Sequence, residues 1–172
     1  EEHADMPRSG WEGRLRLAAR AIDQRLKADG LQTVCHGDAK SANIIFAAGP
    51  TPLLYDFQYC GKAPATKDLA YLLNVASDDP RNEERFLQFY HNVLSERLEA
   101  QGDTPPTMEA LRASLELSYC DLARFLVSFG FWGHDDIRQK TRAVLDRLDG
   151  GKALKSEEEY VEAVKREFPL TA

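Results

Sequence analysis

His36-Gly37-Asp38-Ala39-Lys40-Ser41-Ala42-Asn43 is followed, after an apolar segment, by Tyr55-Asp56-Phe57-Gln58. The first stretch reads H-G-D-x-x-x-x-N and the second contains D-F-Q. Asp38 and Asn43 stand five positions apart, and Asp56 follows Asn43 by thirteen. Two carboxylates and one amide at these spacings determine how the rest of the chain is interpreted.

These residue types are the groups that phosphoryl transfer requires. One carboxylate accepts the proton of the attacking hydroxyl, while an amide oxygen and a second carboxylate hold Mg²⁺ against the nucleotide phosphates. The protein-kinase catalytic loop, H-R-D-x-x-x-x-N, has the same spacing ahead of its D-F-G. Asp38 is therefore the candidate catalytic base, and Asn43 and Asp56 are the candidate metal ligands. The structural alternative for all three is a turn residue that bonds to nearby backbone.

At these residues the chain resembles the large lobe of the aminoglycoside phosphotransferase and choline kinase group, which are protein-kinase-like enzymes that phosphorylate small molecules. H-G-D in place of H-R-D carries the resemblance, and D-F-Q is typical of the ecdysteroid-kinase-like branch. Gly61 and the run 67–73 match as well, so the specific resemblance covers about residues 33–75. It implies ATP and Mg²⁺ as cofactors and the hydroxyl of a small molecule as acceptor.

The resemblance also implies roles for the neighbours of the base. Lys40, two residues after Asp38, would reach the transferred phosphate, although a solvated lysine is the alternative. His36 would brace the loop by bonding to backbone near Asp56. Asp68 would hold the loop by accepting backbone hydrogen bonds and would cap the helix that follows, with Thr66 as a competing N-cap.

The segment before His36 lacks the parts that a nucleotide lobe supplies. It has no glycine-rich loop, no alternating strand pattern and no V-A-I-K-like lysine. We therefore expect the N-terminal lobe to be missing from this chain, as in a fragment or a truncated gene product, and its partner to be that lobe or a complementary segment. The chain alone is then expected to bind nucleotide weakly and to lack activity.

Two other functions compete with a small-molecule kinase. A kinase-like remnant without catalysis would serve as a binding or regulatory module. A metal-dependent hydrolase would use His36, Asp38 and Asp56, but hydrolase sites usually bring more His or carboxylate ligands together.

Composition favours one cytoplasmic domain spanning 1–172. The chain has 43% hydrophobic residues, enough for a core, and no apolar run of the roughly 20 residues that a membrane helix needs. Its net charge of −6 argues against nucleic acid as a partner. Three widely spaced cysteines without a C-x-x-C pair fit reduced thiols.

The pattern along the chain predicts a mainly α fold with a small β-hairpin element, an α+β arrangement. Residues 33–58 hold the catalytic loop and the metal hairpin, and 66–168 form a helical body. Antiparallel pairing of the hairpin would bring Asn43 and Asp56 together. Expected helices are 11–29, capped by Ser9, then 66–77, 80–101, 106–130, 135–149 and 156–168. Expected strands are 33–35, 43–46 and 52–55, with a turn at 47–51 and a glycine- and proline-bearing stretch at 59–65.

Two features of the helical half carry open alternatives. The aromatic residues Phe125, Phe129, Phe131 and Trp132 would line an acceptor pocket or lie in the helix core. The pair 135–136 would face a cationic acceptor or form a solvated helix start. Apolar residues at helical spacing predict buried faces: Phe86, Phe89, Tyr90, Val93, Leu94 and Leu98 in one helix, and Leu111, Leu115, Leu117, Leu122, Leu126 and Phe129 in the next.

Overall fold

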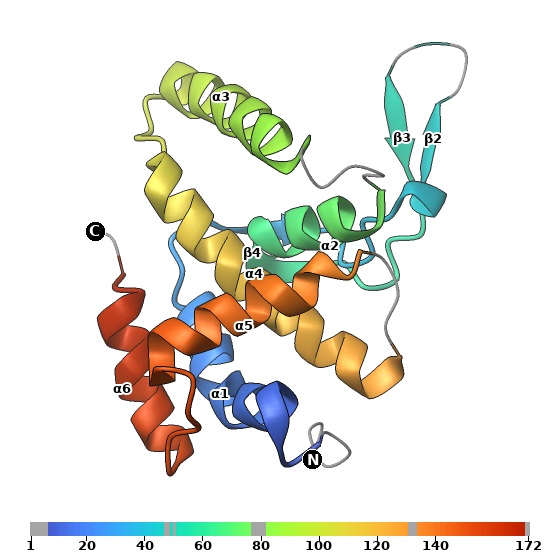
Figure 1. The fold of residues 1–172 in the computed structure, drawn as a ribbon. Helices are drawn as coiled ribbons and strands as arrows, with labels where there is room; N and C mark the ends of the chain where they lie inside the picture. Colours follow the sequence, from blue (N-terminus) through green and yellow to red (C-terminus); the bar gives the residue numbers. More distant parts are fainter. Residues whose placement is uncertain (1–6, 47–48, 50, 77–81, 131–133, 171–172) are drawn as a thin grey trace.

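The computed structural model describes residues 7–46, 49, 51–76, 82–130 and 134–170. Over these ranges the chain is mainly helical with two small antiparallel sheets, which confirms the predicted fold class (Figure 1). The described part contains no helix that is both long and apolar enough to span a membrane. The elements are α1 Gly10–Lys27, β1 Gln32–Cys35, a 3₁₀ turn Ser41–Asn43, β2 Ile44–Phe46, β3 Pro52–Leu54, β4 Gly61–Pro64, α2 Thr66–Ala76, α3 Glu83–Gln101, α4 Met108–Phe129, α5 Asp136–Asp149 and α6 Glu157–Glu167.

The hydrophobic core lies among α1, α4, α5 and α6. The long helix α4 crosses the middle of the molecule, with α1 and α5 packed against it and α6 against α1 (Figure 1). Each helix contributes side chains that are at most 1% exposed, namely Leu15, Ile22, Leu111, Leu117, Leu126, Ile137, Leu145, Tyr160 and Val164. Full burial of each such side chain contributes about 1.5–3 kcal/mol.

A buried polar cluster joins three of these helices. The guanidinium of Arg14 on α1 binds both carboxylate oxygens of Asp149, at 2.5 and 2.9 Å, and the hydroxyl of Tyr160 on α6 donates to Asp149 at 2.6 Å. The side chain of Asp149 is fully buried. Because every buried charge here has a partner, the cluster fixes how the three helices meet without leaving an unsatisfied group.

The strands pair in two separate antiparallel sheets. β2 pairs with β3 with Ile44 opposite Leu54, so the predicted hairpin is confirmed; its predicted turn includes 47, 48 and 50, which lie outside the described residues. β1 pairs with β4, with Cys35 opposite Gly61. No strand was predicted within the glycine- and proline-bearing stretch 59–65, because β4 has no apolar alternation and is defined by its pairing with β1. Asn43 closes a 3₁₀ turn and does not begin the strand.

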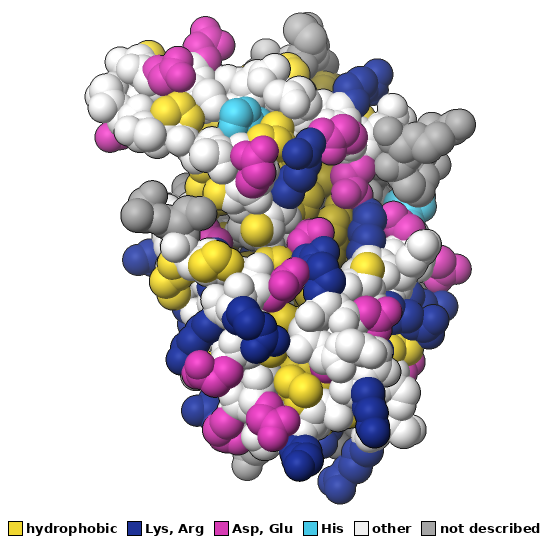
Figure 2. Space-filling view, turned by 60° about the vertical axis from the view of Figure 1, so that its left-hand side comes forward, with side chains coloured by type: hydrophobic (Ala, Val, Ile, Leu, Met, Phe, Trp, Pro, Cys, Tyr) yellow, Lys and Arg dark blue, Asp and Glu magenta, His cyan; other side chains and the backbone are white. Residues whose placement is uncertain are grey.

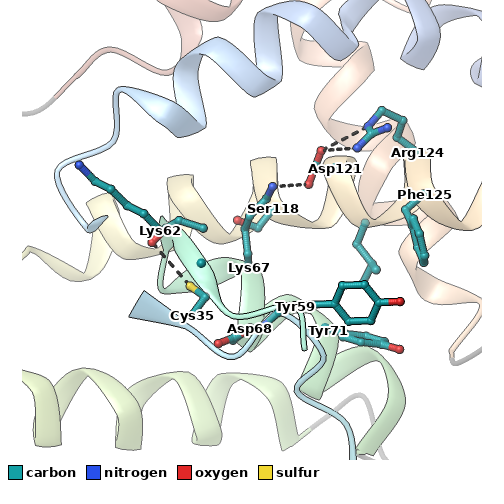
Figure 3. Close-up of a pocket in the computed structure, with 14 residues that line it drawn as sticks. Cys35, Tyr59, Lys62, Lys67, Asp68, Tyr71, Ser118, Asp121, Arg124 and Phe125 are labelled. Carbon is teal, nitrogen blue, oxygen red and sulfur yellow. Dashed lines mark hydrogen bonds and ion pairs between the residues drawn. The ribbon is translucent and has the colours of Figure 1, made fainter. Parts of the chain in front are cut away.

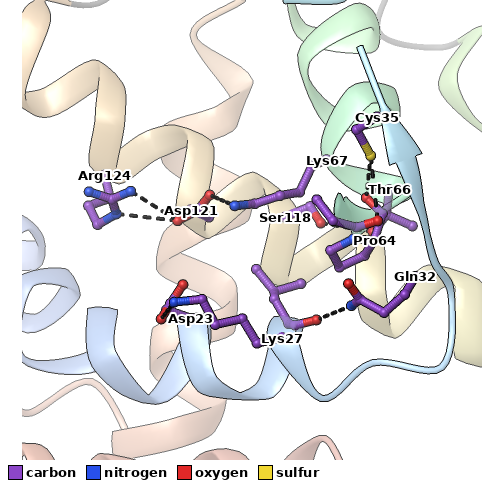
Figure 4. A network of polar contacts seen from close by, with 12 residues as sticks. Asp23, Lys27, Gln32, Cys35, Pro64, Thr66, Lys67, Ser118, Asp121 and Arg124 are labelled. Atoms are coloured by element: carbon purple, nitrogen blue, oxygen red, sulfur yellow. Dashed lines mark hydrogen bonds and ion pairs between the residues drawn. The ribbon is translucent and has the colours of Figure 1, made fainter. Parts of the chain in front are cut away.

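The helices begin and end close to the predicted residues, but several predicted caps were wrong. Ser9 occupies the N-cap position of α1 without a side-chain cap. Thr66 is the first residue of α2, and its hydroxyl bonds Ser114 and Ser118 on α4 at 2.8 and 2.9 Å. Figure 4 shows Thr66 and Ser118. That contact ties the start of α2 to α4. The cap of α4 is Thr107, which accepts a hydrogen bond from the Ala110 amide.

The predicted buried face of α3 is only partly covered: Tyr90, Val93, Leu94 and Leu98 are half-buried, and Tyr90 packs against the core. Phe86 and Phe89 are 40% and 68% exposed, and Leu87, outside the predicted stripe, is the buried residue of this helix. Charged contacts hold its first turn: Glu83 accepts from Tyr119 of α4 and pairs with Lys140 of α5. On the face seen in Figure 2, basic and acidic side chains are interspersed over the surface.

Candidate functional site

The segment 36–43 folds into a tight loop around the Asp38 side chain. The Asn43 amide nitrogen donates to the Asp38 carbonyl at 3.0 Å and to its carboxylate at 2.9 Å. The backbone amide of Lys40 also donates to the Asp38 carbonyl, at 2.9 Å. Asp38 and Asn43 are both buried, at 7% and 4% exposure. The loop therefore presents one well-held carboxylate oxygen to the Lys40 side of the site.

His36 braces this loop, as the sequence predicted. Its Nε2 lies 2.8 Å from the Tyr55 carbonyl, and its Nδ1 accepts the Asp38 backbone amide at 3.2 Å. Because Nδ1 accepts, Nε2 carries the proton and donates to Tyr55, which gives a neutral ring with a fixed tautomer. The ring also packs against Phe57 with centroids 4.7 Å apart. His36 thus connects the loop 36–43 with the segment that follows the hairpin.

Asp68, from the first turn of α2, holds the loop from the other side. Its two carboxylate oxygens accept the backbone amides of His36 at 2.6 Å and of Gly37 at 2.9 Å. These are charge-assisted hydrogen bonds, about twice as strong as neutral ones. The predicted role of Asp68 as a backbone acceptor is confirmed.

Gly37 is required by the shape of the loop. Its φ is +83°, and a Cβ at this position would lie 2.2 Å from the Tyr59 carbonyl oxygen. A side chain would therefore displace the backbone at residue 59. Because the H-G-D motif has a glycine at position 37, the loop can lie against the backbone of Tyr59, which follows D-F-Q.

The charge of Asp38 is stabilised by its partners. Burial disfavours the carboxylate, but hydrogen bonds from Lys40 and Asn43 outweigh that effect and hold the pKa of Asp38 below its usual range. Tyr71 of α2 adds a further hydrogen bond to the same carboxylate. The Lys40 ammonium lies 2.8 Å from the Asp38 carboxylate, and this hydrogen bond raises the pKa of Lys40. Asp38 is therefore an ionised acceptor, as a proton-accepting group must be.

Asp56 lies just after the hairpin strand β3. It is exposed, has a φ of +64° and is the one non-glycine residue with positive φ in the described part of the chain. The strained backbone turns the chain sharply after β3, and such strain often accompanies functional positions. The Tyr55 amide donates to the Asn43 carbonyl at 3.2 Å, so hairpin pairing brings the Asp56 segment beside Asn43. Asp56 also lies near enough to Lys40 to help raise its pKa.

The donor set around Asn43 and Asp56 suits a hard cation. The side-chain hydrogen bonds of Asn43 to described residues run through Nδ2, so its Oδ1 is the atom available to a metal. Asp56 accepts one long hydrogen bond, 3.4 Å, from Gln58. In the ranges the structure describes, no three His, Cys, Asp or Glu side chains converge. One carboxylate and one amide oxygen match Mg²⁺, which takes few protein ligands and completes its shell with phosphate and water.

Several features of the surroundings were not predicted from the sequence. Tyr71 reaches Asp38, and its only sequence signal is its place three residues after Asp68, on the same face of α2. Of the predicted aromatic patch, Phe125 and Phe129 pack together at 4.6 Å and are 40% and 71% exposed, so they are not core residues. The other two members, 131 and 132, lie outside the described residues. The pair 135–136 forms the start of α5, where ion pairs join it to Arg138 and Lys140.

One of three comparisons with known proteins found a match. A family model described as "Phosphotransferase enzyme family" matches residues 2–111, more than half of the chain and all of the candidate site residues. Comparisons with curated proteins and with solved structures found no match.

Proposed function

Because this chain belongs to the phosphotransferase enzyme family, we propose that it supplies the catalytic base and the metal ligands of a site that phosphorylates the hydroxyl of a small molecule. The donor is ATP. The observation that carries the proposal is the hydrogen-bonded unit of Asp38, Asn43 and Lys40, with Asp56 adjacent across the hairpin. Within the family, the D-F-Q sequence favours the ecdysteroid-kinase-like branch.

Asp38 acts as the base in this proposal. The acceptor oxygen forms a bond to the γ-phosphorus of ATP, the bond from that phosphorus to the β–γ bridging oxygen breaks, and ADP leaves with that oxygen. The hydroxyl proton passes to the Asp38 carboxylate. Because the pKa of Asp38 lies below its usual range, the group contributes mainly by orienting the hydroxyl and accepts the proton late. His36 and Asp68 keep the loop in position while this occurs.

Lys40 and the metal ligands act on the phosphates. Lys40 has its ammonium on Asp38 at 2.8 Å and is partly exposed, so a short side-chain movement would transfer it to an incoming γ-phosphate. Asn43 through Oδ1 and Asp56 through its carboxylate would hold Mg²⁺. Bound there, the cation neutralises the charge that develops on the phosphate oxygens.

The test is a metal titration of the chain in the presence of ATP. Mn²⁺ replaces Mg²⁺ as a paramagnetic probe, and broadening of backbone NMR signals reports where it binds even when affinity is weak. We expect ATP-dependent broadening at residues 36–44 and 54–58. The variant Asp56→Asn should abolish it, since asparagine tolerates the positive φ of this position while removing the charge.

The matched control is Asp103→Asn, which removes an exposed carboxylate outside the site. It should leave the broadening unchanged. Broadening centred on the acidic first turn of α6, or broadening that survives in Asp56→Asn, would contradict the metal assignment. Where a preparation shows ATP-dependent transfer, Asp38→Asn should lower turnover by about 10²–10⁴-fold with little change in nucleotide binding. Near-normal turnover would refute the base assignment.

A further inference from the structure

A cleft lies beside the catalytic loop, next to Asp38 in sequence at Gly37 but without Asp38 in its lining. It has a volume of about 320 Å³ and lies between the β1–β4 side of the molecule, α2 and α4 (Figure 3). The lining of the cleft includes Gly37 of the loop. It also includes Asp68, the clamp that accepts the backbone amides of His36 and Gly37. Tyr71 is part of the lining too, and it makes a hydrogen bond to the Asp38 carboxylate. A molecule in the cleft that touches Tyr71 is therefore next to the candidate base.

The carboxylates in the cleft wall already have partners. Both oxygens of Asp68 accept backbone amides of the catalytic loop. Asp121 on α4 accepts Arg124 through Oδ1, at 3.2 and 3.3 Å, and lies 2.8 Å from the Lys67 ammonium through Oδ2. All four carboxylate oxygens are thus engaged, which leaves no unoccupied acceptor oxygen as a specific partner for a cationic ligand.

Two of the cations in the same wall, Lys67 and Arg124, have more donors than partners among the residues that the structure describes. Lys67 has three N–H donors and Arg124 has five, and their ion pairs within these residues go to the single carboxylate of Asp121. Their side chains are 35% and 21% exposed, so a ligand can reach them. Figures 3 and 4 show Lys67 of α2 reaching Asp121 and Arg124 of α4, so that the three side chains form one row.

The row keeps a net positive charge. Burial disfavours the ionised form of Asp121, but Lys67 and Arg124 outweigh it and hold the pKa of Asp121 below its usual range. With Asp121 ionised, two cations and one anion give the row a charge of +1. A single carboxylate on a ligand would bring the charge of the row to zero, whereas a dianionic phosphate would make it negative.

Aromatic surface adjoins the row. Tyr59, Tyr71 and Phe125 lie together toward one end of the cleft (Figure 3). Tyr59 and Phe125 are 65% and 40% exposed, so their rings offer apolar area that a ligand would cover. The cleft therefore combines spare cationic donors, an apolar end and Tyr71, which bonds the candidate base.

We propose that the hydroxyl acceptor of this site carries a carboxylate that binds Lys67 and Arg124, and an apolar body that lies against Tyr59, Tyr71 and Phe125. This inference rests on the proposed function and names its substrate class as hydroxy acids with an apolar or aromatic group. It assigns Arg124 as the specificity-determining residue, because two of its five donors are used on Asp121 and no other described residue accepts from the guanidinium.

The test compares three ligands that share a benzyl group and differ in charge. They are 3-phenyllactate, its uncharged amide, and the cationic amino alcohol 2-amino-3-phenylpropan-1-ol, each titrated by NMR into the chain without nucleotide. We expect 3-phenyllactate to bind about tenfold more tightly than the amide and the amine to bind most weakly. Signals of residues 59–71 and 118–125 should shift. Arg124→Gln should reduce the preference to less than about threefold, and Arg124→Lys should retain part of it.

Arg138→Gln is the matched control. Arg138 also pairs with an aspartate three residues earlier on a helix, but it is not part of the cleft lining. It should leave the preference intact. Equal binding of the three ligands, tightest binding of the amine, no binding of any of them, or a preference that survives in Arg124→Gln would overturn the inference.

The two proposals can fail separately, because these titrations need no nucleotide. ATP-dependent metal binding without a carboxylate preference would refute the acceptor class and leave the phosphotransferase site standing. A carboxylate preference without nucleotide or metal binding would make the cleft a carboxylate site and refute its role as an acceptor pocket.

Discussion

The helical body and the β-region of this molecule are held together by different forces. In the body, side chains such as Leu117 and Leu145 are fully buried between helices. In the β-region, Val34, Phe46 and Leu53 are 75%, 66% and 54% exposed, and the strands are only three or four residues long. The candidate site lies in the second region. Its geometry therefore depends on hydrogen bonds to backbone, with little support from apolar burial.

The largest expected effect comes from opening a cavity in the body. Leu117→Ala should lower the free energy of unfolding by about 2–5 kcal/mol, because neighbouring helices cannot close the space of a fully buried leucine. Leu53→Ala on β3 should change it by less than about 0.5 kcal/mol. Urea denaturation followed by far-UV circular dichroism measures both. Similar losses for the two variants would show that the β-region is packed more tightly than its exposure indicates.

Next in size is the effect of a side chain on the catalytic loop. Gly37 and Gly102 have nearly the same φ, +83° and +82°, but a Cβ meets the Tyr59 carbonyl at 2.2 Å in the first and nothing within 4 Å in the second. Gly102→Ala should cost about 1–2 kcal/mol from its left-handed backbone alone. Gly37→Ala adds the clash, and its total should reach about 3 kcal/mol or appear as local unfolding of the loop.

Native-state hydrogen exchange separates those two outcomes. In Gly37→Ala, amides of residues 36–43 should exchange faster while those of α4 remain protected. Equal stability of the two alanine variants would mean that the loop has room to move away from Tyr59, and that the site is less rigid than its contacts imply.

The same contrast explains what sequence reasoning could predict. The helices were predicted well because apolar periodicity is a local property of the sequence. The loop residues were found because their spacing matches that of phosphoryl-transfer motifs. β4 was missed because Gly61-Lys62-Ala63-Pro64 has no strand pattern of its own and pairs only because β1 lies beside it. Phe86 and Phe89 were assigned to a buried face, since periodicity shows that a helix has an apolar side and not that another element covers it.

Within the site, what sequence could not supply was contact between elements. The roles of Asp68 and His36 followed from the motif. The approach of Tyr71 to Asp38, and the row of Lys67, Asp121 and Arg124, depend on how α2 packs on α4. Spacing places Tyr71 on the face of Asp68 and pairs Asp121 with Arg124, but the contacts of α2 residues with Asp38 and with Asp121 are tertiary.

A smaller effect should follow from weakening the Asp68 clamp. Asp68→Asn leaves one oxygen for the two backbone amides of His36 and Gly37, so one donor loses a charged acceptor. We expect a loss of about 1–2 kcal/mol and faster hydrogen exchange at those two amides. Asp23→Asn, at an exposed pair on α1, is the control and should change neither. Unchanged exchange in Asp68→Asn would show that the loop holds its shape without the clamp.

The smallest effect concerns pH, and it isolates the charge of the candidate base. An unfolded aspartate takes up its proton near pH 3.8, whereas folded Asp38, hydrogen-bonded to Lys40 and Asn43, does so at lower pH. Folding therefore favours the ionised form, and this contribution is present above pH 3.8 and lost as pH falls through the folded pKa. Asp38→Asn should lower the free energy of unfolding by about 1 kcal/mol or less near neutral pH, with the difference shrinking on acidification.

Urea denaturation of wild type and Asp38→Asn, from neutral pH down through the folded pKa of Asp38, measures this difference in the free energy of unfolding. Lys40→Met should weaken the same pH dependence, because it removes the ion pair. A difference between wild type and Asp38→Asn that stays constant with pH would mean that the two forms differ in packing alone. Such a result would show that packing holds Asp38 in place, as it does the side chains of the helical body, and that hydrogen bonds to its charge do not. A difference that fades on acidification would instead show that the loop is built to keep this carboxylate charged, which is the state that a proton acceptor needs.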